Sequence, residues 1–227
     1  MADSPADTVA DTAAPPIGIK ICGLTEPEGL DAAIAHGADW VGFVFFARSP
    51  RAVTPAQAAP LAARVPPGGP QRIGLFVAPD DDAIAATLDA VALDGLQIYA
   101  PEARALEIRE RFRLPVWHAR GVTTTADLPA TSRLDGLVIE SRPPAGADRP
   151  GGNAQPIDWT LPKDWLAPVP WMLAGGLTPE TVALAIALSG APAVDVSSGV
   201  ESAPGRKDAR LIARFIQAAR QGAYQRP

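Results

Sequence analysis

The sequence predicts a single α/β domain folded as a closed (β/α)₈ barrel. Short β-rich runs alternate with alanine-rich helical stretches along most of the 227-residue chain, and glycines recur just beyond the carboxyl ends of the runs. Strict alternation of this kind favours a parallel sheet with right-handed crossovers. Eight such units in a chain of this length fit a barrel near its minimum size.

Each predicted strand is a short apolar run that ends at turn residues. In chain order the strands are residues 17–22, 39–45, 72–77, 93–98, 115–119, 135–139, 169–173 and 193–196. Helices are expected over 26–36, 55–65, 81–88, 102–112, 179–188 and 207–220, with a weaker helical piece at 158–165. An open doubly wound sheet is the alternative, but residues 23–29 (GLTEPEG) lack the glycine-rich fingerprint expected after its first strand.

Composition narrows the possible partners and the compartment. The net charge is −5 without a basic stripe, which argues against nucleic acid and anionic membranes as partners. No apolar run approaches the roughly 18 residues of a membrane span. Residues 1–16 are mostly Ala, Asp, Thr and Pro and predict a disordered tail, which leaves 17–227 as the catalytic barrel domain. A single cysteine indicates a cytoplasmic protein.

That cysteine, Cys22, ends the first predicted strand and precedes Gly23. At the carboxyl end of a barrel strand, a side chain can face the pocket in which barrel enzymes carry out their chemistry. A thiolate at such a place can act as a base or a nucleophile. The alternative is that Cys22 is only a small buried hydrophobic residue.

The loops after the last two strands predict an anion site. Gly175 and Gly176 follow the seventh strand, and the eighth is followed by Ser197, Ser198 and Gly199. Thr178 and Pro179 are expected to start a helix as N-cap and first helical residue. Backbone N–H groups of such loops commonly hold a phosphate in barrels, although ordinary helix capping would explain each loop alone.

Four motifs resemble the phosphoribosylanthranilate isomerases of tryptophan biosynthesis. They are KICGLT at 20–25, GADWVGFVFFARSPRAV at 37–53, AGGLTPETV at 174–182 and VDVSSGVESAPGRKD at 194–208. The resemblance implies the Amadori rearrangement of N-(5-phospho-β-D-ribosyl)anthranilate to 1-(2-carboxyphenylamino)-1-deoxy-D-ribulose 5-phosphate, without metal or organic cofactor. It also implies that Cys22 is the general base, that Arg51 contacts the anthranilate carboxylate, and that Asp195 lies against the substrate.

Three positions depart from the pattern of that family. Glu140 stands where the general acid is usually aspartate, and it keeps the carboxyl group on a side chain one bond longer. The usual QLHG is here Gln97, Ile98, Tyr99 and Ala100, so a binding role of the histidine would pass to Tyr99, beside Gln97. Gly152 belongs to a glycine pattern after the sixth strand that is only partly kept.

Two other classes of function remain open at this point. A related phosphate-binding barrel, of the histidine-pathway isomerase or indoleglycerol-phosphate synthase type, is an enzymatic alternative. The non-catalytic alternative is a barrel that binds phosphate but catalyses no reaction. The expected partner is a small phosphorylated substrate, and the chain is expected to be a monomer or a homodimer.

Overall fold

Eight parallel strands close into a barrel in the computed structural model, which describes residues 16–142, 146 and 157–223. The strands are β1 (Gly18–Cys22), β2 (Trp40–Val44), β3 (Gln71–Val77), β4 (Gly95–Tyr99), β5 (Val116–Val122), β6 (Gly136–Ser141), β7 (Trp171–Leu173) and β8 (Ala193–Val196). β1 pairs with both β2 and β8, which closes the sheet on itself. The predicted closed barrel is therefore confirmed.

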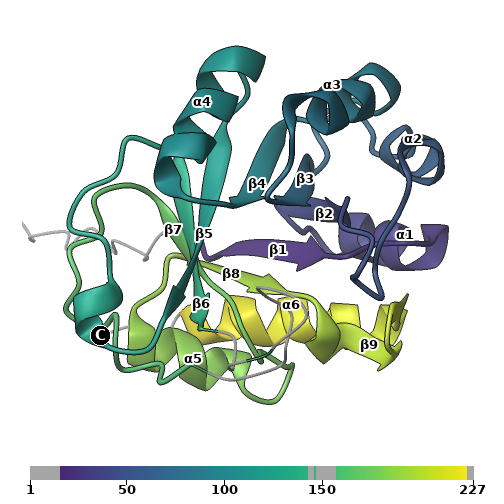
Figure 1. Cartoon of the computed structure of the whole chain (residues 1–227). Coiled ribbons are helices and arrows are strands. Elements are labelled where there is room, and N and C mark those ends of the chain that lie inside the picture. The colour runs from purple at the N-terminus through teal and green to yellow at the C-terminus, as the bar shows by residue number, and fades with distance from the viewer. Residues whose placement is uncertain (1–15, 143–145, 147–156, 224–227) are drawn as a thin grey trace, which may run out of the picture.

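Helices surround the barrel on the outside, as Figure 1 shows. The described residues form α1 (Pro27–Ala35), α2 (Pro55–Ala62), α3 (Asp81–Ala90), α4 (Glu102–Phe112), α5 (Val182–Ser189) and α6 (Ala209–Ala223). Local sequence explains several of their ends. Thr54 and Gln57 form a capping box at the start of α2, and Asp80 accepts a hydrogen bond from the Ala83 N–H at the start of α3. Gly190 ends α5 in the left-handed region at φ 68°.

The structure corrects two predicted helices. The piece expected at 158–165 consists of turns, in which the Asp158 carboxylate accepts hydrogen bonds from the Thr160 N–H and hydroxyl. Such local side-chain bonding competes with helix formation. α5 begins at Val182, so Thr178 and Pro179 precede it within a turn and do not start it. The tail expected at 1–16 lies, apart from Pro16, outside the described residues.

Alternation along the strands divides the buried residues into two sets. One large cluster, which includes Ile19 and Ile21 of β1, packs between the barrel and its helices. A smaller cluster fills the barrel interior with Ala119, Val138 and Met172. Because side chains alternate along a strand, every second residue of β1 points inward, and these are Lys20 and Cys22. The lysine and the cysteine of β1 therefore point into the barrel interior.

A small hairpin follows the last barrel strand. The 3₁₀ turn η2 (Ser198–Val200) leads into β9 (Glu201–Ala203), which pairs antiparallel with β10 (Arg206–Lys207). In Figure 1 the hairpin lies at one end of the barrel, near α1. In the part of the chain that the structure describes, no helix is long and apolar enough to cross a membrane.

Candidate active site

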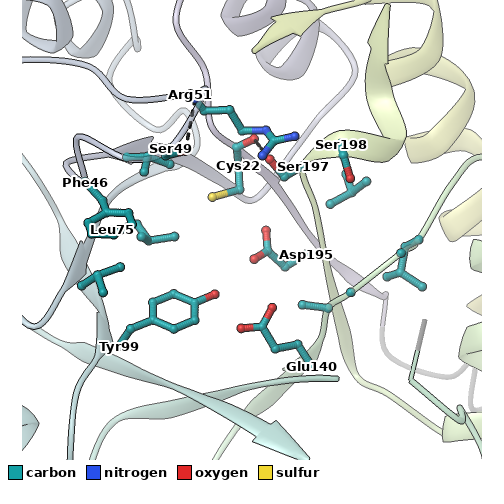
Figure 2. Close-up of a pocket in the computed structure, with 17 residues that line it drawn as sticks. Cys22, Phe46, Ser49, Arg51, Leu75, Tyr99, Glu140, Asp195, Ser197 and Ser198 are labelled. Carbon is teal, nitrogen blue, oxygen red and sulfur yellow. Dashed lines mark hydrogen bonds between the residues drawn. The ribbon is translucent and has the colours of Figure 1, made fainter. Parts of the chain in front are cut away.

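A cavity lies at the carboxyl ends of the barrel strands, and Figure 2 shows side chains from several strands pointing into it. Cys22, Tyr99, Glu140 and Asp195 come from β1, β4, β6 and β8. The rest of the lining consists of Val44, Phe46, Ser49, Arg51, Leu75, Val77, Ala174, Gly175, Gly176, Leu177, Val196, Ser197 and Ser198. Residues far apart in sequence thus share one site at the end of the barrel that sequence analysis indicated.

Cys22 occupies a narrow place at the top of β1. It lies opposite Gly42 in the strand pairing, and a Cβ atom on Gly42 would come within 2.8 Å of the thiol sulfur. The residue is 4% exposed, and in Figure 2 the sulfur points into the cavity. Burial raises the pKa of the Cys22 thiol, and the Lys20 ammonium opposes that rise.

Lys20 and Asp195 form a buried ion pair beneath the thiol. Lys20 Nζ donates to Asp195 Oδ1 at 3.0 Å, and the two residues are directly opposite in the pairing of β1 with β8. Burial alone would lower the pKa of Lys20, but the Asp195 carboxylate and Cys22 keep it above its ordinary value. Lys20 is therefore a fixed positive charge close to the Cys22 thiol.

Tyr99 and Glu140 lie together on another wall of the cavity. In Figure 2 the Tyr99 hydroxyl points toward the Glu140 carboxyl group. Burial raises the pKa of Tyr99 well above its ordinary value, and the Glu140 carboxylate raises it further. Two of the three departures from the family pattern, Tyr99 and Glu140, therefore lie side by side in the structure.

Arg51 enters the site from the loop after β2. Gly23 makes room for it, because a Cβ atom on Gly23 would lie 2.5 Å from Arg51 Cδ, and the φ of Gly23 is +74°. The guanidinium group donates from Nε and Nη2 to both carboxylate oxygens of Glu201, at 2.6 and 2.8 Å. One edge of Arg51 is thus already occupied by a residue of the chain.

The loops after β7 and β8 form the remaining wall. Gly175 and Gly176 have φ values of 90° and 68°, a conformation that suits glycine, and both border the cavity together with Ser197 and Ser198. Gly199 does not line the cavity. A Cβ atom there would lie 1.8 Å from Leu177 O, so this glycine allows the two loops to pack against each other.

Another predicted residue, Gln97, lies outside the cavity lining. Gln97 is buried below Tyr99, and its Nε2 donates to the Tyr99 hydroxyl at 3.4 Å. Gly152 is outside the described residues. Nor does His118 line the cavity: its Nε2 lies 2.8 Å from Ala100 O, and burial lowers the pKa of its imidazole.

Sequence reasoning missed several residues that shape the site. Lys20 stands in the KICGLT motif, Glu201 and Lys207 stand in VDVSSGVESAPGRKD, and the apolar wall includes Phe46 and Leu75. The signal that could have found Lys20 is a charged residue within the otherwise apolar first predicted strand. Among the described residues, no group of three or more His, Cys, Asp and Glu side chains could hold a metal ion.

Comparison with known proteins identifies the relatives of this architecture. Residues 19–218 match the family model described as N-(5'phosphoribosyl)anthranilate (PRA) isomerase. A relative named N-(5'-phosphoribosyl)anthranilate isomerase from Acidiphilium cryptum is 56% identical over 203 residues, or 88% of this chain and 97% of its own length. One of the same name from Rhodospirillum rubrum is 51% identical over 213 residues, 90% and 98% of the two chains.

Solved structures agree with the sequence relatives. The phosphoribosyl anthranilate isomerase from Thermotoga maritima is 32% identical with a TM-score of 0.77, over 90% of this chain and 99% of that one. Another structure with the same coverage, 32% identity and a TM-score of 0.76, is a phosphoribosyl anthranilate isomerase in complex with reduced 1-(o-carboxyphenylamino)-1-deoxyribulose 5-phosphate. The resemblance inferred from the four motifs is confirmed.

Proposed function

The chain belongs to the N-(5'-phosphoribosyl)anthranilate isomerase family, and we propose that Cys22 and Glu140 are the base and the acid of its reaction. That reaction converts N-(5-phospho-β-D-ribosyl)anthranilate to 1-(2-carboxyphenylamino)-1-deoxy-D-ribulose 5-phosphate. One observation carries the assignment: a thiol from β1 and a carboxyl group from β6 point into the same cavity (Figure 2).

The chemistry needs one acid and one base. Protonation of the ribose ring oxygen by Glu140 breaks its bond to C1′ as the anilino nitrogen forms a Schiff base. The Cys22 thiolate then takes the proton from C2′, and the electron pair of that C–H bond forms the enolamine. Tautomerisation of the enolamine gives the ketone. A positioned acid or base typically contributes about 10²–10⁴-fold to such a rate.

Lys20 explains how a buried thiol can serve as the base. Burial raises the pKa of Cys22 and so disfavours the thiolate, whereas the ammonium two residues earlier on the same strand favours it. Asp195 holds that ammonium with one carboxylate oxygen and borders the cavity, where it can also contact the ribose hydroxyls.

The two anionic ends of the substrate fit two different walls. Backbone N–H groups of the Gly175–Gly176 and Ser197–Ser198 segments would hold the phosphate. Arg51 would bind the anthranilate carboxylate, and the apolar side chains of Phe46, Leu75 and Val77 would contact its aromatic ring. Binding both ends would hold the ribose between Cys22 and Glu140.

Genetic rescue tests the function and the base together. The chain should restore growth without tryptophan to a host that lacks this isomerase, and Cys22→Ala should abolish the rescue. With purified protein, Cys22→Ser should lower turnover by about 10²–10⁴-fold, because a serine hydroxyl is far too weak a base. The affinity of Cys22→Ser for reduced 1-(o-carboxyphenylamino)-1-deoxyribulose 5-phosphate should stay near that of the unchanged protein. Turnover of Cys22→Ser at the wild-type level would exclude Cys22 as the base.

The remaining expectations concern assembly and compartment. Cytoplasmic location is consistent with a biosynthetic small-molecule reaction and with a chain whose single cysteine cannot form an intramolecular disulfide. A phosphoribosylanthranilate isomerase from Thermotoga maritima is dimeric, and this chain, 31% identical to it, is expected to be a monomer or a homodimer. Sedimentation equilibrium would decide between the two states.

A further inference from the structure

The hairpin formed by β9 and β10 makes a set of contacts that converge on Arg51. Glu201, its first residue, receives two hydrogen bonds from the guanidinium group of Arg51 and one at 2.8 Å from Lys207 Nζ. Glu201 and Lys207 have side chains only 5% and 0% exposed. The ion pairs of Glu201 with Arg51 and with Lys207 are therefore shielded from water, and the attraction between the charges is stronger than in a surface pair.

The turn of the same hairpin contacts the loop that follows β1 and the loop that carries Arg51. The Gly205 N–H donates to Glu201 Oε2 at 3.3 Å, and Gly205 O accepts a hydrogen bond from Thr25 Oγ1 at 2.9 Å. A Cβ atom on Gly205 would lie 2.3 Å from Pro50 O, immediately before Arg51. The turn thus packs directly against both loops.

Lys207 extends these contacts to the loop after β8. Its Nζ donates to Ser197 O at 2.9 Å and approaches Ser197 Oγ at 3.3 Å, while the Ser197 hydroxyl donates to Cys22 O at 3.0 Å. A continuous chain of polar contacts therefore joins the arginine, the loop after β8 and the backbone of the cysteine.

From these contacts we infer that Glu201 and Lys207 are positioning residues that fix which edge of Arg51 faces the substrate carboxylate. Glu201 occupies Nε and one hydrogen of Nη2, so the groups left for a ligand are Nη1 and the other hydrogen of Nη2. Those two groups form the end-on edge of the guanidinium, which can still bind a carboxylate through two parallel hydrogen bonds. This inference rests on the proposed role of Arg51.

Charge favours this arrangement over a neutral one. Two cations and one carboxylate leave a net positive cluster beside the site, which suits an anionic substrate. Burial alone would raise the pKa of Glu201, but hydrogen bonds from Arg51 and Lys207 keep it below its ordinary value. The carboxylate therefore stays ionised and holds both cations. Without it, Arg51 and Lys207 would repel each other and the guanidinium would lose its fixed orientation.

Two ligands isolate the contribution of the carboxylate contact. The first is reduced 1-(o-carboxyphenylamino)-1-deoxyribulose 5-phosphate, and the second is the same compound without its ring carboxylate. The dissociation constant of the second ligand divided by that of the first measures what the carboxylate contributes to binding. The phosphate contacts are common to both ligands. In Arg51→Ala this ratio should fall close to one, and a ratio that stays at the wild-type value would overturn the role proposed for Arg51.

Glu201→Gln tests the positioning itself. Glutamine keeps the shape but removes the charge that holds the guanidinium, so the ratio should fall by about tenfold while affinity for inorganic phosphate is retained. KM should rise more than kcat falls, because the loss lies in binding. Asp94→Asn is the matched control, since Asp94 also receives two hydrogen bonds from a guanidinium group, that of Arg72, outside the cavity lining. Its ratio should remain at the wild-type value.

A second variant keeps the test usable if Glu201→Gln does not fold. Glu201→Gln combined with Lys207→Met removes the carboxylate together with its buried ammonium partner, so Lys207 is not left as an unpaired buried charge. In the double variant, the ratio of dissociation constants should fall by the same factor. A wild-type ratio in either folded variant, with Arg51→Ala still deficient, would overturn the positioning role and leave the role of Arg51 intact.

Discussion

Lys20 Nζ lies 3.0 Å from Asp195 Oδ1 inside the barrel, and Cys22 follows Lys20 by two residues on the same strand. Residues two apart on a strand point to the same side, so thiol, ammonium and carboxylate share the barrel interior. The ion pair therefore influences both the charge of the thiol and the orientation of the carboxylate.

The first prediction concerns the pH dependence of the thiol. Its pKa is raised in the folded protein, so the thiolate and kcat/KM should increase as pH rises through the neutral range toward a midpoint above the ordinary value for cysteine. Lys20→Met should move that midpoint still higher, because an ammonium that favours the thiolate is lost. The chain has one cysteine, so thiolate absorbance measures the titration without interference from other thiols.

Two controls make this titration decisive. Cys22→Ser supplies the baseline from tyrosines, and Lys163→Met removes an exposed lysine that is not part of the cavity lining. The exposed variant should titrate like the unchanged protein. A lower or unchanged midpoint in Lys20→Met would contradict the electrostatic role of Lys20.

The second prediction separates the two anion sites. Inorganic phosphate should compete with the substrate and raise the melting temperature, since it binds the folded state. Arg51→Ala should weaken binding of the anthranilate end but keep the rise in melting temperature with phosphate, because Lys207 still pairs with Glu201 next to the Ser197 loop. Thermal shift with a phosphate titration measures this directly. Equal loss of both effects would show that Arg51 supports the whole site.

The third prediction ranks side chains at position 140. Glu140→Gln keeps the size but has no transferable proton, so turnover should fall by about 10²-fold or more. Glu140→Asp moves the carboxyl group back by about one C–C bond, roughly 1.5 Å, and should be intermediate. Turnover is compared among variants of matched thermal stability. A glutamine variant as active as the unchanged enzyme would remove Glu140 from the mechanism.

The fourth prediction tests whether Tyr99 and Glu140 act together. Their side chains face each other in the cavity (Figure 2), so Tyr99→Phe should lower kcat/KM more when glutamate is at 140 than when aspartate is there. Directly contacting residues show interaction energies of about 0.5–3 kcal/mol in such cycles. Kinetics of the two single variants and the double variant give this value. Strict additivity would mean that the two substitutions are independent.

Most of the barrel could be predicted because each strand is a local apolar run. Strand β8 and helix α4 have the predicted bounds, and the other strands differ by one to three residues at their ends. The helix expected at 158–165 was wrong because the side chain of Asp158 binds its own neighbours, a local contact that hydrophobic spacing does not reveal. The late start of α5 is a similar boundary effect.

The sequence by itself determined the barrel fold. It also indicated that the site lies at the carboxyl ends of the barrel strands. Inward alternation along parallel strands brings Cys22, Tyr99, Glu140 and Asp195 to a single cavity once the strand ends are known. Family motifs then indicated the reaction.

Only the tertiary structure decided how these groups are held. Arg51 and Glu201 are 150 residues apart, and no local pattern in the chain relates them. Their ion pair forms because the hairpin after β8 packs against the loop after β2, at a place where Gly23 and Gly205 permit close approach. Likewise Lys20 meets Asp195 only because β1 and β8 become neighbours when the barrel closes. Such contacts depend on chain closure in three dimensions, which residue spacing along the sequence does not specify.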